Sequence, residues 1–163
     1  MINLRPLQIK DKTLMKEWMT DSEVTKFFRF SSYNDAKVTQ FIENSLNDSL
    51  NKHFAIVDSH DDYLGTISLK NIDLENKHAE YAIVLRKEYW GKGIGRLATH
   101  LILDYAEKVN LHKIYLNVLQ TNISAIKLYK SCGFIESGIY RDHLYRDNKY
   151  YNLLYFEKIM GDE

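Results

Sequence analysis

A glycine-rich segment between an apolar strand and an amphipathic helix constrains the fold of this chain more than any other feature. It reads Tyr-Trp-Gly-Lys-Gly-Ile-Gly over residues 89–95. Residues 81–85 before it are nearly all apolar and predict a buried strand, and apolar residues recur at helical spacing from Ile94 to Val109. Backbone N–H groups and the positive end of the helix dipole gather where such a helix begins. The segment therefore predicts a site for a phosphate-bearing cofactor, and the alternative is a tight connection without a ligand.

Two common nucleotide-binding motifs do not account for this segment. The P-loop motif G-x-x-x-x-G-K-S/T is absent. The dinucleotide motif is G-x-G-x-x-G. If it starts at Gly91, its last glycine is replaced by Arg96. If it starts at Gly93, the last glycine is replaced by Ala98, which a looser form of the motif allows. The strand expected next, residues 113–119, has no acidic residue to bind a ribose. A nicotinamide-dependent oxidoreductase is therefore disfavoured.

Length and composition exclude several classes of protein. With 163 residues, we expect a single domain over 1–163. The 22 basic and 22 acidic residues balance, which argues against a nucleic-acid partner. The single cysteine, Cys132, fits a reducing compartment, and neither a signal peptide nor an apolar run of membrane-spanning length is expected. The six histidines lack metal-ligand spacing. We expect a cytoplasmic protein without membrane or metal.

The apolar periodicity predicts the element order β, α, α, β, β, β, α, β, α, β, β. The predicted strands cover residues 2–7, 53–57, 63–72, 78–85, 113–119, 134–145 and 150–159. The predicted helices lie after Asp11, after Asn34, over 94–109 and over 122–131, with Asp11 and Asn34 as N-caps. Residues 21–30 are expected to form a shorter helical or loop segment. This order predicts an α/β fold with a central mixed, mostly antiparallel sheet of about seven strands and helices on both faces.

Three segments together resemble the GNAT family of N-acetyltransferases. Residues 89–96 resemble the family's Q/R-x-x-G-x-G/A loop, and residues 122–134 resemble its N-x-x-A-x-x-x-Y-x-x-x-G-F segment. The third segment is the acidic strand start Ala79-Glu80-Tyr81. The element order extends the resemblance over essentially the whole chain. One departure is Trp90, which stands where the family most often has Gln or Arg.

The resemblance implies acetyl-CoA as the co-substrate and a splayed pair of parallel strands that holds it. The pantetheine arm is expected to pair with the strand 81–85, which places Ile83, Val84 and Leu85 in contact with it. The pyrophosphate is expected on the amides of Gly91, Lys92, Gly93, Ile94, Gly95 and Arg96.

The resemblance also implies roles for individual side chains in acetyl transfer. Tyr129 is the expected proton donor to the departing thiolate, and Glu80 the expected base for the amine, with His78 and Tyr81 as weaker alternatives. Asn122 is expected to cap its helix and, secondarily, to contact the cofactor. Backbone N–H groups near Ile83 or Val84 would polarise the thioester carbonyl. We expect direct transfer, because Cys132 next to a helix-ending glycine is more typical of a packed residue than of a nucleophile.

The acceptor is expected to be a primary amine of a small molecule, with a polyamine such as spermidine favoured. A polyamine requires clustered carboxylates, for which Asp21, Glu23 and Glu43 are candidates. The alternatives are an amino-sugar nucleotide, bound by Arg29, Arg141 and Tyr145, or the N-terminus of a ribosomal protein. Another class is a non-catalytic acetyl-CoA-binding module. A homodimer is possible. Residues expected by location to line the acceptor site are Trp18, Phe27, Phe28, Arg29, Tyr33, Tyr140, Tyr145 and Tyr151.

Overall fold

The computed structural model describes residues 1–28 and 34–161. Its core is one seven-stranded sheet in the order β1-β2-β3-β4-β5-β7-β6. All neighbouring strands are antiparallel except β4 and β5. The strands are β1 (Asn3–Pro6), β2 (Lys52–Val57), β3 (Tyr63–Asp73), β4 (His78–Leu85), β5 (Lys113–Leu119), β6 (Ile135–Arg146) and β7 (Lys149–Ile159). The predicted fold class and the predicted order of strands along the chain are confirmed.

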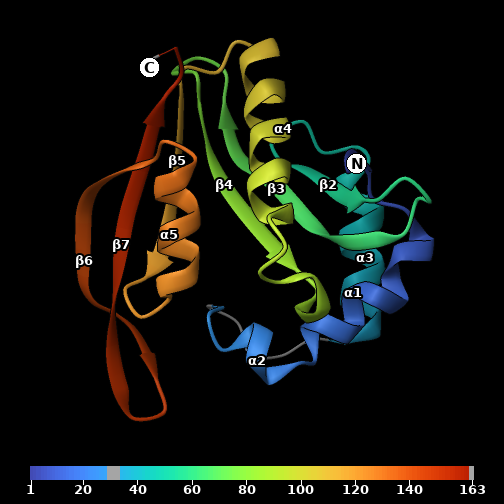
Figure 1. Cartoon of the computed structure of the whole chain (residues 1–163), viewed down its shortest axis with the longest axis horizontal. Coiled ribbons are helices and arrows are strands. Elements are labelled where there is room, and N and C mark those ends of the chain that lie inside the picture. The colour runs from blue at the N-terminus through green and yellow to red at the C-terminus, as the bar shows by residue number, and fades with distance from the viewer. Residues whose placement is uncertain (29–33, 162–163) are drawn as a thin grey trace.

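Helices cover both faces of the sheet (Figure 1). The first group is α1 (Lys12–Met19), α2 (Ser22–Thr25) and α3 (Asp35–Ser45), whose apolar residues pack on one face of β2 and β3. The second group, α4 (Ile94–Lys108) and α5 (Ile123–Ser131), packs on the opposite face. Because side chains alternate along a strand, Ile67 and Leu69 of β3 join the α4 side. Thr66 and Ser68 are left on the α1–α3 side.

Asp11 occupies the expected N-cap position of α1, but its side chain does not cap that helix. Asp11 already has helical backbone angles after the short 3-10 turn Ile9–Asp11, and its side chain makes no cap hydrogen bond to α1. Its buried carboxylate instead accepts two hydrogen bonds from the Arg5 guanidinium, at 2.8 and 2.9 Å, and one from the Gln8 N–H. A buried carboxylate requires such a partner, and this requirement overrides the capping role. Asn34 and Asn122 do cap α3 and α5.

The apolar faces of the helices are narrower than the periodicity predicts. Ala98, Ile102 and Ala106 of α4 are fully buried, whereas Leu97 on the same helix is 54% exposed. Likewise, Val38 and Ile42 of α3 are buried, but Leu46 is exposed. The sheet contacts only a limited arc of each helix, so the outer edge of each apolar stripe faces solvent.

The parallel strands β4 and β5 pair only at their first residues. Their register joins His78 with Lys113, Ala79 with Ile114 and Glu80 with Tyr115, and no further pair follows. Beyond Glu80, β4 stays paired with β3 as far as Leu85, while β5 stays paired with β7. The two strands therefore diverge, and the gap between them widens along the sheet (Figure 1). The implied splay is present in this chain.

Close packing of β3 on β4 yields a stability prediction at Gly65. A Cβ atom added there would lie 2.2 Å from the Val84 carbonyl oxygen, a backbone atom that cannot move aside. We expect Gly65→Ala to lower the free energy of unfolding by about 1–3 kcal/mol, as overpacking does. The matched control is Gly138→Ala on β6, where the nearest atom to the new Cβ is at 3.8 Å, and we expect a change below about 0.5 kcal/mol. Equal urea midpoints for the two variants would contradict this packing.

Candidate active site

A cleft of about 710 Å³ opens where β4 and β5 separate. One wall is apolar and comes from α1, α3 and the segment after α2. The floor comes from β2, β3 and β4, and the far end reaches β5 and α5. The lining includes Met15, Trp18, Met19, Phe27, Phe28, Lys37, Val38, Phe41, His53, Thr66, Ser68, Lys70, Glu80, Tyr81, Ala82, Ile83, Val84, Asn117, Val118, Leu119, Asn122, Tyr129, Leu144 and Leu153. An apolar cleft with a few convergent polar groups is typical of a small-molecule site.

The glycine segment lies in the turn from β4 into α4, where Gly91 and Gly93 are exposed and Gly95 is buried. Gly91 and Gly93 have φ of +69° and +77°, a region that other residues rarely adopt, and a Cβ at either position would meet nothing within 4 Å. Gly93 is the N-cap of the 15-residue helix α4. The first N–H groups of a helix have no intrahelical partner. The turn therefore has open space beside it, unshielded amides and a favourable dipole, which fit a pyrophosphate.

Trp90, the departure from the family pattern, has a structural role. Its indole N–H donates a hydrogen bond to the Leu85 carbonyl, at 3.0 Å. This contact ties the start of the glycine turn to the end of β4. The nearby Lys92 ammonium lies 5.5 Å from the centre of the Tyr89 ring, and Arg96 is exposed. Both cations remain available to a phosphate.

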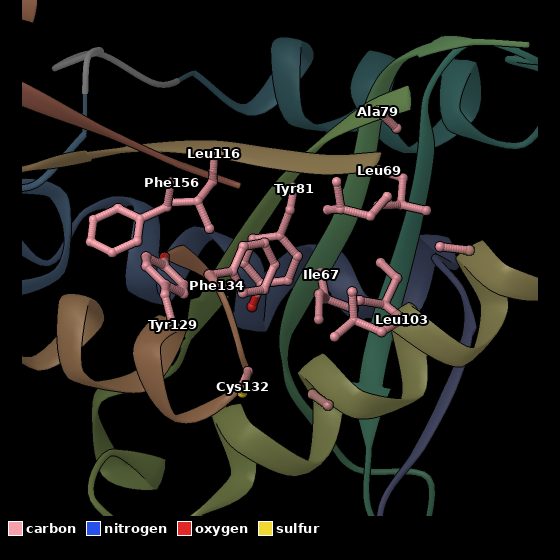
Figure 2. Close-up of a cluster of buried hydrophobic side chains, with 14 of the residues drawn as sticks. Ile67, Leu69, Ala79, Tyr81, Leu103, Leu116, Tyr129, Cys132, Phe134 and Phe156 are labelled. Atoms are coloured by element: carbon pink, nitrogen blue, oxygen red, sulfur yellow. The ribbon is translucent and has the colours of Figure 1, made fainter. Parts of the chain in front are cut away.

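Tyr129 lies in an apolar environment at the inner end of the cleft. Its ring contacts Tyr81, Phe134 and Phe156, with ring centres 5.7, 6.1 and 6.5 Å away (Figure 2). Burial raises the pKa of its hydroxyl well above the usual range. In the part of the chain that the structure describes, no protein group hydrogen-bonds this hydroxyl, which is therefore available to a ligand in the cleft.

Tyr81, the weaker alternative, is already bonded within the protein. Its hydroxyl lies 2.7 Å from the Thr99 hydroxyl, which in turn donates to the Gly95 carbonyl at 2.6 Å. Burial raises the pKa of Tyr81 well above its ordinary value. This chain of contacts fixes the first turn of α4 against β4, so we assign Tyr81 a positioning role.

Glu80 lies on the floor of the cleft at the last paired position of β4 and β5. Its side chain is 17% exposed. Its carboxylate accepts a hydrogen bond from the Asn71 amide at 3.1 Å and lies 3.6 Å from the Lys70 ammonium. The other candidate base, His78, lies outside the lining residues and packs against Tyr115. The carboxylate is anchored but accessible, as a base in the cleft requires.

The cleft contains six polar residues that the sequence did not single out. They come from α3, β2, β3 and β5 and are Lys37, His53, Thr66, Ser68, Lys70 and Asn117. His53 shares a hydrogen bond of 2.6 Å with Ser68. Burial, and then the charge of Lys70, lower the pKa of His53 to about 4, so this imidazole is neutral at neutral pH. The alternation of polar residues at positions 66, 68 and 70 is the sequence pattern that could have indicated these residues, because it places three polar side chains on one face of the sheet.

The structure brings together some of the expected site residues and separates others. Glu80, Ile83, Val84, Asn122 and Tyr129 all line the cleft, and so do Trp18, Phe27 and Phe28. Leu85 and the segment Gly91–Arg96 lie at the edge of the gap, outside the lining residues. Tyr140, Tyr145, Tyr151 and Arg141 do not line the cleft either, and Arg29 and Tyr33 lie outside the described residues.

The carboxylates expected to bind a polyamine do not line the cleft. The Asp21 side chain caps α2 by accepting from the Glu23 N–H, and the Glu23 carboxylate pairs with Lys26 at 3.4 Å. Glu43 is exposed on α3. The three acids therefore do not gather in this cleft, because each is bound locally or faces solvent.

One long-range contact fixes the rim of the cleft. The Arg146 guanidinium, at the end of β6, donates to the Lys26 carbonyl at 2.7 Å and to the Phe28 carbonyl. This contact connects the strand that carries Leu144 with the segment that carries Phe28, and both side chains line the cleft. The β6–β7 hairpin and the segment after α2 thus act as one wall.

The comparison with known proteins gives the class first and then the family. A family model described as an acetyltransferase (GNAT) domain matches residues 2–135, so the chain is an acetyltransferase. Since the match covers most of its length, the chain belongs to the GNAT family of N-acetyltransferases.

Two curated relatives and one solved structure illustrate the similarity. An uncharacterised N-acetyltransferase p20 of Bacillus licheniformis is 30% identical over 148 residues, which cover 87% of this chain and 83% of that protein. The spermidine N(1)-acetyltransferase of Vibrio cholerae is 29% identical over 139 residues, 84% of this chain and 80% of that protein. The crystal structure of the Vibrio cholerae spermidine N-acetyltransferase in complex with CoA and spermine superposes with a TM-score of 0.92 at 24% identity, over 98% and 96% of the two chains. At that identity the superposition confirms the fold.

Other observations bear on partners. None of the helices in the described ranges is long and apolar enough to cross a membrane. Within those ranges, no group of three or more His, Cys, Asp or Glu side chains is arranged to hold a metal ion. Cys132 is buried at the end of α5 (Figure 2).

Proposed function

We propose that this protein transfers the acetyl group of acetyl-CoA to a primary amine of a small molecule, directly within a complex of enzyme, donor and acceptor. The observation that carries the proposal is the opening of β4 from β5 between a phosphate-competent glycine turn and a cleft that holds Glu80 and Tyr129. A donor bound in this gap would reach the cleft from one side of the sheet, and the acceptor would enter from the other.

The donor is held by backbone groups in this proposal. The edge of β4 from residue 81 to 85 is unpaired on the β5 side and is free to bond the amides of a pantetheine arm. The amides from Gly91 to Arg96 receive the pyrophosphate. An N–H group at Ile83 or Val84 polarises the thioester carbonyl and stabilises the oxyanion that forms during attack. The N-cap role of Asn122 orients α5, and with it Tyr129.

In this proposal, the side chains of Glu80 and Tyr129 transfer the protons. Glu80, directly or through water, accepts a proton from the acceptor ammonium so that the neutral amine attacks. A tyrosine hydroxyl keeps its proton at neutral pH, and burial raises the pKa of Tyr129 further. In this proposal Tyr129 donates that proton to the sulfur as negative charge develops there. The same apolar surroundings disfavour a bare thiolate, which favours its protonation. The buried Cys132 has no role in this scheme.

Spermidine is the first acceptor to test, because the relatives include spermidine acetyltransferases. Amino-sugar nucleotides and N-terminal peptides of ribosomal proteins are the alternatives within the same class. A non-catalytic acetyl-CoA-binding module is disfavoured by the available Tyr129 hydroxyl and the intact glycine turn. The experiment is thiol release from acetyl-CoA with each amine, against a control without acceptor. Acceptor-dependent release supports the proposal, and acetyl-CoA binding without release from any acceptor contradicts it.

The role of Glu80 yields a second prediction. We expect Glu80→Gln to lower kcat/KM for the amine by about 10²-fold, as the loss of a general base does, and to flatten the acidic limb of the pH–rate profile. The amide keeps the shape of the side chain and can still contact Asn71. The matched control is Glu136→Gln on exposed β6, which should behave as wild type. An unchanged pH profile in Glu80→Gln would exclude Glu80 as the base.

A further inference from the structure

We infer that the acceptor amine carries an anionic group, a carboxylate or a phosphate, that the cleft recognises through Lys37. This inference rests on the proposed acetyl transfer and deepens it by naming the acceptor class. The inferred acceptor differs from the polyamine acceptor of the relatives. A polycation requires a negatively charged site, whereas the charged residues that line this cleft sum to a positive charge.

The polar groups of the cleft form a row across the sheet floor. Register places Lys70 of β3 opposite Glu80 of β4, and Ser68 of β3 opposite His53 of β2. At the β5 end of the row is Asn117, whose side-chain oxygen is buried with no hydrogen-bond partner among the described residues. The row therefore runs from the diverging strands, where the reaction would occur, towards α3.

The formal charges of all the residues that line the cleft sum to a positive value. The charged residues that line the cleft in the described ranges are Lys37, Lys70 and Glu80, because the buried His53 is neutral. The unmatched cation is Lys37, which has no ion pair in that part of the chain. A polyamine with several positive charges would face net repulsion here.

The positions of the charged groups along the cleft also fit an acceptor that has an amine at one end and an anion at the other. Hydrogen-bond acceptors for an ammonium, Glu80 and the unpartnered Asn117 oxygen, lie beside the opened strands. Lys37 lies in the first turn of α3, in the wall of the cleft that α1 and α3 form. Phe41, four residues later on the same helix, contacts His53 of the floor, with ring centres 4.5 Å apart. An acceptor with its amine at Glu80 and its anion towards Lys37 matches this order. The apolar wall between the two ends would cover its body.

Matched acceptor pairs test this inference. Tyramine and tyrosine differ by a carboxylate, and glucosamine and glucosamine 6-phosphate differ by a phosphate. We expect the anionic member of at least one pair to have a kcat/KM about tenfold or more above both its partner and spermidine, and the favoured pair distinguishes carboxylate from phosphate. Equal performance by spermidine or by the members that lack the anionic group would overturn the inference while supporting acetyl transfer. Acetyl-CoA binding without release for any amine would contradict both.

A charge reversal provides the second measurement. Lys37→Glu should lower the preference for the anionic acceptor over spermidine by about tenfold, without changing acetyl-CoA affinity. The variant should fold, because Lys37 is exposed and a first-turn glutamate suits the helix dipole. The control is Lys108→Glu at the end of α4, about 22 Å from the glycine turn, which should leave the preference unchanged. An unchanged preference in Lys37→Glu would overturn the inference.

Discussion

Tyr129→Phe should lower kcat by about 10²-fold or more while acetyl-CoA affinity stays within about threefold of wild type. The substitution removes one hydroxyl and leaves the ring among Tyr81, Phe134 and Phe156. Because no described protein group hydrogen-bonds this hydroxyl, its removal leaves no buried partner unsatisfied, and we expect stability to change little. The loss should therefore fall on the chemical step, which initial rates at saturating acetyl-CoA and acceptor would measure.

The control for this prediction is Tyr105→Phe. Tyr105 lies on α4, packs against Phe54 with ring centres 5.2 Å apart and is outside the cleft. It should keep wild-type kcat, which separates the role of the Tyr129 hydroxyl from any general effect of losing a tyrosine. A Tyr129→Phe enzyme with normal turnover would refute the proton-donor role, and we would then look for a water-mediated route to the thiolate.

Gly93→Val should weaken acetyl-CoA binding by at least about tenfold. Gly93 has a φ of +77°, where a β-branched residue is strained by about 1–3 kcal/mol, so the turn must change its course. Its Cβ would also project into the open space where we place the pyrophosphate. Calorimetric titration of acetyl-CoA measures the affinity directly, and the KM for acetyl-CoA should rise in parallel.

Gly161→Val is a closely matched control for the glycine turn. Gly161 has a similar φ of +85°, and a Cβ there also meets nothing within 4 Å, but it follows β7 and lies away from the turn. It should share the local strain and keep the affinity for acetyl-CoA. If both variants bind acetyl-CoA as tightly as the wild type does, the assignment of the turn is refuted.

Local patterns predicted the fold well, for physical reasons. Strand alternation and helical spacing depend on neighbours a few residues apart, and these gave the order of the elements and the start of α4. The caps at Asn34 and Asn122 are also local, since each side chain bonds an amide three residues later. The motif at 89–96 and the one at 122–134 then led to the family, which the family model confirms.

The acceptor side was much less predictable, because it is built from contacts between distant segments. Lys70 faces Glu80 only through the register of β3 on β4, and Lys37 joins them only because α3 packs over that face. The ion pair of Arg5 with the buried Asp11 was unpredictable for the same reason, since the local capping pattern at Asp11 contains no information about Arg5 on β1. Residue type suggested Asp21, Glu23 and Glu43 as a cluster, but the fold gives each a local partner or an exposed position.

Titration of the wild-type protein with acetyl-CoA and with a nicotinamide dinucleotide tests the central claim, that the diverging strands and the glycine turn bind an acetyl donor. We predict saturable binding of acetyl-CoA at a single site, competed by CoA and absent for the dinucleotide. Binding of the dinucleotide in place of acetyl-CoA, or no binding of acetyl-CoA at all, would contradict the account.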